Sequence, residues 1–255
     1  MPHWDLPNMP PWKPLFVGII KVLTTIKQNR LQELGAIFYF CSMQVKEDKK
    51  VQLVWRAEWQ DLGFRQRFQW GLLVWVLVLI AFPFFFQFIE QRSGWAPNDW
   101  VLDQLPSYDT SIPCFLVIWG MFGLFFYRSL YQPRLLLLFL WGFIVLSLMR
   151  FCSIYLLPLE PPANLIPLRD PISNLFYGGK DAFITKDLFF SGHTSTQFLI
   201  FLCLSKKSDK WLALIASFAI GIMVLIQHVH YTMDVLAAPP LTYLVYIIAK
   251  KIASY

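Results

Sequence analysis

Six long apolar stretches set the strongest constraint on what this chain can fold into. They cover about residues 70–89, 112–130, 135–157, 188–205, 211–228 and 232–249. A helix of about 20 apolar residues crosses the hydrocarbon core of a bilayer, which is roughly 30 Å thick. The fourth and sixth stretches also carry polar residues at one end. The sequence therefore predicts an all-α, polytopic membrane protein built as a bundle of six transmembrane helices.

The composition agrees with this class and excludes others. Of the 255 residues, 56% are hydrophobic and 15% are charged, and the mean hydropathy is +0.49, which is far from an average soluble domain. The net charge of +6 does not indicate a nucleic-acid partner, because the basic residues form no single patch and no binding motif is visible. The four cysteines show no CxxC or paired spacing, so neither a zinc site nor a disulfide framework is expected.

Lysine and arginine residues gather in alternate flanks of the six stretches. The basic flanks hold Lys46, Lys49, Lys50, Arg56, Arg65, Arg67, Arg128, Arg134, Lys206, Lys207, Lys210, Lys250 and Lys251. The loop over residues 90–110, in contrast, is mainly acidic. Because basic flanks remain in the cytoplasm, both termini are predicted to be cytoplasmic.

Two segments precede the apolar stretches. Residues 1–42 contain only short apolar runs and lack the basic start and cleavage site of a signal peptide. Because a chain that opens at Met43 would still include every apolar stretch, we expect residues 1–42 to be a dispensable N-terminal extension. Residues 43–69 are predicted to be a cytoplasmic juxtamembrane segment, because aromatic and charged residues alternate over 51–70. That pattern is typical of an amphipathic helix at a membrane surface, or of a solvated helix packed on cytoplasmic loops. Residues 70–255 then form the six-helix domain.

Polar residues gather at the outer ends of the last three stretches. Ser191 and His193 lie within about two turns of the outer surface, and the fifth stretch returns the chain to that surface at His230 and Asp234. Since these last two are four residues apart, the carboxylate can orient the imidazole on one side of a helix. Ionisable residues inside membrane segments are costly, which makes them functional candidates. We predict a site on the exoplasmic (periplasmic or lumenal) side.

Three further polar residues lie near this site in the predicted topology. Arg150 occupies the outer half of the third stretch, where an arginine suits a phosphate-bearing substrate; an ion pair with Glu160 or Asp187 is the structural alternative. Asp187 can tune His193 or cap the fourth helix. His228 is two residues from the next histidine and so points elsewhere if that segment is helical.

The motifs "SGHTS" and "HYTMD" resemble the catalytic region of sphingomyelin synthases, a branch of the type 2 phosphatidic acid phosphatase (PAP2) superfamily. The resemblance covers roughly residues 70–250. It implies that His230 is a nucleophile that forms a phosphohistidine, that Asp234 orients it, and that His193 is general acid and then base. The candidate substrate-binding residues are Ser191, Arg150, Asp187, Tyr231 and His228. The resemblance implies no cofactor and no metal.

The choice between transfer and hydrolysis rests on cationic residues. The phosphatase branch has a Lys…Arg-Pro element before its Ser-Gly-His and an arginine six residues before its last histidine; here Arg169 precedes Asp170, and Val224 takes the second position. A phosphomonoester carries roughly −1.5 to −2 charge and invites several cations, whereas a phosphodiester headgroup needs fewer. We expect transfer of phosphocholine or phosphoethanolamine from a glycerophospholipid to a ceramide-like or diacylglycerol alcohol.

Several alternatives stay open at this point. Phosphoinositol transfer is compatible with the same residues, since the residues that line the headgroup pocket cannot be placed. A lipid phosphatase or hydrolase would use the same histidines, and a non-enzymatic lipid-binding or transport protein could retain the motif as a relic. The sequence makes no prediction about homo-oligomers.

Overall fold

The computed structural model describes residues 47–168 and 184–254. The chain divides into two units, Met1–Leu53 and Val54–Tyr255. Of the first unit, only residues 47–53 are described, and they are helical. The predicted extension over residues 1–42 therefore lies outside the described residues.

The described part of the second unit is helical and has no strand, apart from a single parallel bridge between Trp95 and Leu159. Its named elements are α2 (Leu62–Glu90), the 3-10 helix η1 (Leu102–Gln104), α3 (Ser111–Tyr131), α4 (Pro133–Leu156), α6 (Gly192–Cys203), α7 (Lys207–Ile226) and α8 (Thr232–Ala253). The all-α prediction is confirmed for these residues.

Five of these helices, α2, α3, α4, α7 and α8, are long and apolar enough to cross a membrane. Large apolar side chains are exposed on these helices, for example Leu77 and Phe84 on α2 and Ile215 and Phe218 on α7. Such apolar exposure is unusual for a soluble monomer. These observations support an integral membrane protein, while the sides on which the termini and the site lie stay predictions.

The fourth expected helix differs from the prediction of a full membrane span over residues 188–205. Helix α6 has 12 residues, which gives a length of about 18 Å. It begins late because Ser191 is its N-cap and accepts the N–H of Thr194 at 3.4 Å, which ends the extended approach before it. Of the six predicted spanning helices, five are long and apolar enough to cross a membrane, and α6 is not.

The first helix also starts earlier than expected. Asp61 caps α2 by accepting the N–H of Gly63 at 2.9 Å, so residues 62–70 continue directly into the span. Before this cap, Trp55 donates its indole N–H to the carbonyl of Leu130, and Glu58 pairs with Arg134 at 2.8 Å. Residues 55–58 of the predicted amphipathic segment thus pack on the turn between α3 and α4. Its position at a membrane surface stays a prediction.

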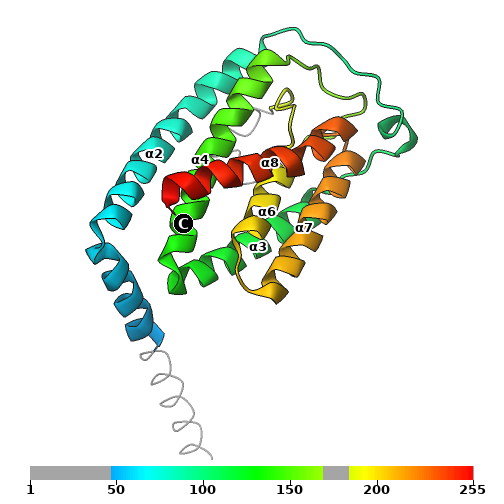
Figure 1. Cartoon of the computed structure of the whole chain (residues 1–255). Helices are drawn as coiled ribbons and strands as arrows, with labels where there is room; N and C mark the ends of the chain where they lie inside the picture. The colour runs from blue at the N-terminus through cyan, green and yellow to red at the C-terminus, as the bar shows by residue number, and fades with distance from the viewer. Residues whose placement is uncertain (1–46, 169–183, 255) are drawn as a thin grey trace, which may run out of the picture. The chain divides into compact units, whose positions relative to one another are not determined.

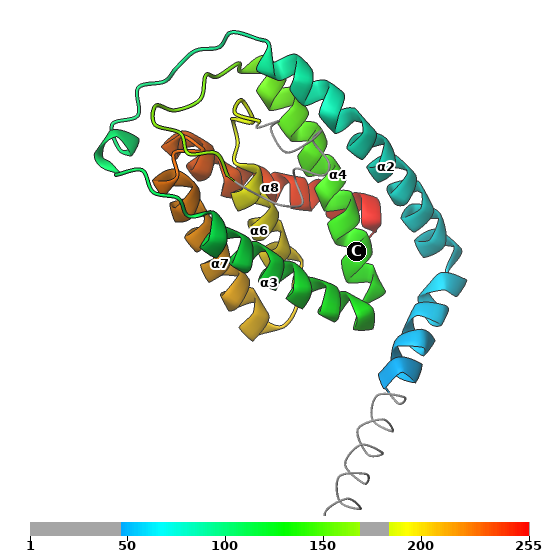
Figure 2. The ribbon, with the colours of Figure 1, turned by 180° about the vertical axis from the view of Figure 1, so that it is seen from behind.

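Helix α6 is enclosed by the other helices, and this arrangement positions the site. It packs against α3, α4, α7 and α8. In Figure 1, α8 (red) crosses α4 (green) and lies beside α6 (yellow), and Figure 2 shows α3 and α7 on the opposite side of α6. Leu138, Leu199 and Val245, all fully buried, belong to the core shared by α4, α6 and α8. Both the start of α6 and the start of α8 are therefore held by a packed core.

Candidate active site

The start of α6 brings Ser191 and His193 to one end of the bundle. Ser191 is fully buried, and its hydroxyl oxygen also accepts the Thr194 hydroxyl at 3.1 Å. At the first turn of any helix the backbone N–H groups point away from the helix and carry the positive end of its dipole. An anion can be bound at such a place when further donors are present.

The start of α8 presents the second histidine. Asp234 is fully buried and its Oδ2 accepts the N–H of Tyr231 at 3.1 Å, which closes the capping box of α8. The same Oδ2 lies 3.4 Å from Nδ1 of His230, whose side chain is 2% exposed. The carboxylate therefore contacts the imidazole in the way that the i,i+4 spacing predicts, as an ion-pair contact longer than a short hydrogen bond.

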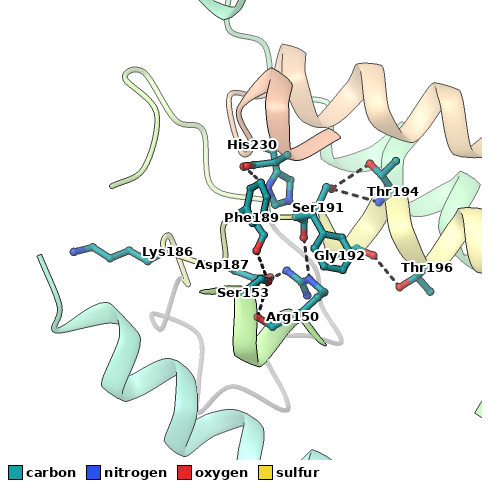
Figure 3. A network of polar contacts seen from close by, with 12 residues as sticks. Arg150, Ser153, Lys186, Asp187, Phe189, Ser191, Gly192, Thr194, Thr196 and His230 are labelled. Atoms are coloured by element: carbon teal, nitrogen blue, oxygen red, sulfur yellow. Dashed lines mark hydrogen bonds and ion pairs between the residues drawn. The ribbon is translucent and has the colours of Figure 1, made fainter. Parts of the chain in front are cut away.

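The two helix starts meet. The rings of His193 and His230 lie 6.5 Å apart between centroids, at an angle of 61°. The backbone N–H of Ser191 donates to the carbonyl of Asp234 at 3.2 Å and joins the two segments directly. Figure 3 shows this region, with His230 beside Ser191 at the start of α6. The structure thus brings together the residues that the sequence analysis treats as catalytic.

Arg150 reaches the same place from α4. Its side chain is nearly buried; Nε donates to the carbonyl of Phe190 at 3.0 Å, and Nη2 pairs with Oδ1 of Asp187 at 2.5 Å (Figure 3). Its guanidinium lies against Gly192, so closely that the methyl group of an alanine there would collide with it. A cation therefore lies beside the first turn of α6, with its charge balanced by one carboxylate.

Two sequence-based alternatives are decided by these contacts. The alternative partner of Arg150, Glu160, pairs with Lys186 at 3.0 Å instead. Asp187 does not cap α6, because that position belongs to Ser191. The expectation that Asp187 serves as the helix cap is therefore wrong, for the physical reason that the cap residue must directly precede the first helical turn.

Two predicted substrate-binding residues make contacts with loop carbonyl oxygens. His228 contacts the carbonyl oxygens of Ala163 at 2.9 Å and Leu105 at 3.0 Å with its two ring nitrogens. The Tyr231 hydroxyl donates to the carbonyl of Glu160 at 3.0 Å; burial first, and then the nearby carboxylates, raise the pKa of Tyr231 to about 12. These contacts give both side chains a structural role in the loops above the histidines.

Sequence reasoning missed Asp99, which lies in the acidic loop between α2 and α3. Its carboxylate accepts the N–H of Thr232 at 2.6 Å, the Thr232 hydroxyl at 3.0 Å and the N–H of Leu102 at 3.1 Å. Burial acts to raise the pKa of Asp99, but these hydrogen bonds outweigh it and the pKa is lowered. Asp99 therefore holds the start of α8, two residues after His230. No local signal could reveal a contact across 133 residues.

The segment leading into α6 is also fixed by two carboxylates, Glu90 and Glu160. Glu90, the last residue of α2, accepts the N–H of Thr185 at 2.6 Å and that of Lys186 at 2.8 Å. The Lys186 ammonium in turn pairs with Glu160, whose pKa is lowered first by the N–H of Gly94 and then by this lysine. The approach to α6 is thus tied to the C-terminal end of α2 and to the segment that follows α4.

Residues 186–251 match the family model described as PAP2 superfamily C-terminal. This match supports the PAP2 superfamily. The matched part of the chain contains His193, His230 and Asp234, while Arg150 lies before it. A superfamily of this kind suggests an activity of the lipid phosphatase or phosphotransferase type. No curated protein matches the chain.

Proposed function

We propose that this protein is a sphingomyelin synthase-like lipid phosphotransferase. It transfers a phosphocholine or phosphoethanolamine headgroup from a glycerophospholipid to a ceramide-like or diacylglycerol alcohol. The observation that carries the proposal is the contact of two imidazoles, His193 and His230, at the joined starts of α6 and α8. The resemblance of the motifs around these histidines adds the substrate class.

The first step is an attack by His230 on the donor phosphorus. Because its Nδ1 faces Asp234, the other ring nitrogen, Nε2, is the nucleophile, and the carboxylate holds the proton on Nδ1. A P–N bond forms while the bond from phosphorus to the diacylglycerol oxygen breaks. His193, as the imidazolium, gives its proton to that leaving oxygen. The products are a phosphohistidine and diacylglycerol.

The second step reverses these roles. His193, now neutral, takes the proton of the acceptor hydroxyl, whose oxygen attacks the phosphorus. The P–N bond to His230 breaks, and the headgroup is now an ester of the acceptor. The second step returns His193 to its protonated state and His230 to its starting form, so the cycle closes without a cofactor.

The charges near the site favour a phosphodiester. Arg150 is the cation beside the first turn of α6, and Asp187 balances its charge. Val224, at the position where the phosphatase branch has an arginine, is fully buried in an apolar cluster with Cys114 and Ile220. A substrate with about one negative charge suits this balance better than a phosphomonoester, whose charge is roughly −1.5 to −2.

Reconstitution of the full chain in vesicles tests the proposal. The vesicles contain phosphatidylcholine and phosphatidylethanolamine, with fluorescent ceramide and fluorescent diacylglycerol as acceptors, and the products are resolved by mass. We expect a phospho-headgroup on one acceptor, and we expect no product with His193→Ala or His230→Ala. Release of phosphate or of a free headgroup without acceptor product would identify the hydrolase. No turnover of any lipid would favour the non-enzymatic binding protein.

We further propose that the site faces the exoplasmic side and that both termini are cytoplasmic. The basic turn at Lys206 and Lys207, between α6 and α7, carries this assignment. The site lies at the opposite end of α6 from that turn. The test is a cysteine placed at residue 208 in sealed vesicles. We expect this cysteine to react selectively with a labelling reagent that is added on the cytoplasmic side.

A further inference from the structure

Gln197 in α6 is a buried polar side chain that has no hydrogen-bond partner among the described residues. It is 1% exposed, and within the part of the chain that the structure describes neither its Nε2 nor its Oε1 makes a hydrogen bond. Thr242 in α8 shares this property at its hydroxyl. A buried polar group that lacks a hydrogen bond is destabilising, and native proteins contain few of them. Such a group in a membrane bundle calls for a functional explanation.

The position of Gln197 relates it to the candidate active site. It follows His193 by four residues, so both lie on one side of α6, with Gln197 about 6 Å further from the helix start. That helix packs against α4 and α8, which carry Arg150 and Asp234. Long side chains on helices point back toward the helix N-terminus. The carboxamide is therefore about one turn from His193, on the side away from the start of α6.

We propose that Gln197 binds the acyl linkage of the lipid substrate, the amide or ester group that joins the lipid backbone to its chain. This inference rests on the proposed function, which places the phosphorus at the histidines and the acyl chains deeper in the bilayer. The acyl linkages then lie between the two, at the level of the carboxamide. The Nε2–H groups donate to the linkage carbonyl, and Oε1 accepts an N–H where the linkage is an amide.

A glutamine suits this task for chemical reasons. It both donates and accepts, so it can satisfy an amide completely and an ester through its carbonyl. The three torsions of its side chain allow the carboxamide to turn toward the lipid from its buried position. A glutamine that served only the fold would satisfy its hydrogen bonds within the bundle, and among residues 47–168 and 184–254 this one does not.

Lipid binding to the full chain in detergent provides the first test. The probes are ceramide, diacylglycerol and a dialkylglycerol, whose ether linkages have no carbonyl; each is titrated while thermal unfolding is followed. We expect the wild type to bind the two carbonyl-containing lipids about two- to tenfold more tightly than the ether, the ratio that one hydrogen bond produces. Gln197→Met should abolish this preference. Thr242→Val, which also removes a buried unpartnered polar group, should retain it.

Stability without lipid separates this role from a structural one. Gln197→Met replaces an unpartnered carboxamide by an apolar group of similar shape, so it should unfold at the same or a higher temperature. A lower unfolding temperature for this variant would overturn the proposal, because it would show that the carboxamide stabilises the fold. Equal binding of ether and carbonyl lipids by the wild type would also overturn it.

Turnover distinguishes this inference from the proposed function. If headgroup transfer occurs, Gln197→Met should raise the apparent KM for carbonyl-containing acceptors two- to tenfold with a smaller change in kcat. If the wild type transfers nothing but still prefers carbonyl lipids in binding, the transferase proposal fails and the role of Gln197 stands. If transfer occurs but the variant has the wild-type lipid preference, the role of Gln197 fails alone.

Discussion

The contact between Asp99 and the start of α8 leads to a prediction with a defined size and pH dependence. The carboxylate accepts two hydrogen bonds from Thr232 and one from Leu102. Loss of a capping acceptor costs about 0.5–2 kcal/mol, and the interaction of its charge with the helix dipole contributes about 0.3–1 kcal/mol. Asn retains one acceptor oxygen, and solvent screens this partly exposed carboxylate. We therefore expect Asp99→Asn to lower the free energy of unfolding by about 1 kcal/mol.

The pH dependence follows from the sign of the pKa change. The pKa of Asp99 is lowered in the folded protein, because its hydrogen bonds outweigh the effect of burial. Its stabilisation is therefore complete above the ordinary aspartate pKa of about 3.9 and is lost as the pH falls through the lower, folded value. Wild type and Asp99→Asn should differ by about 2–4 °C in unfolding temperature at pH 7. The two proteins should converge well below pH 4.

Thermal unfolding in detergent across this pH range measures the effect, and headgroup transfer at pH 7 reports the position of His230. Asp103→Asn is the matched control, since it removes an exposed carboxylate from the same loop. The reasoning would be refuted by equal unfolding temperatures of wild type and Asp99→Asn at pH 7. A difference that persists unchanged at pH 3 would refute the assignment to ionised Asp99.

Three further changes test the site. Asp234→Asn should reduce transfer by about 10²-fold or more while the carboxamide still caps α8; a variant of full activity would contradict the orienting role. His228→Ala should lower stability by about 1–3 kcal/mol with a smaller effect on kcat, as measured by denaturation and turnover; unchanged stability would contradict its loop contacts. Asp187→Asn should uncover the charge of Arg150 and strengthen inhibition by phosphatidic acid about three- to tenfold relative to a diester lipid; equal inhibition curves would contradict this charge balance.

Hydropathy located the helices but not all of their ends. The length of apolar sequence decides that a segment is buried in lipid or protein, and this signal is strongest for α2, α4 and α7. It cannot decide where a helix begins, because one capping side chain outweighs several apolar residues. Ser191 starts α6 late and Asp61 starts α2 early. Both are favoured N-cap residue types, so the signal for these ends was present in the sequence.

The site was predictable to the extent that its contacts are local or follow from topology. The spacing of His230 and Asp234 predicts their contact, and the order of the helices brings His193 to the same end. The hydrogen bonds between Asp99 and the start of α8 depend on how loops and helices pack in three dimensions. The same holds for the lack of hydrogen-bond partners for Gln197 among the described residues. A pattern in one sequence contains no information of that kind.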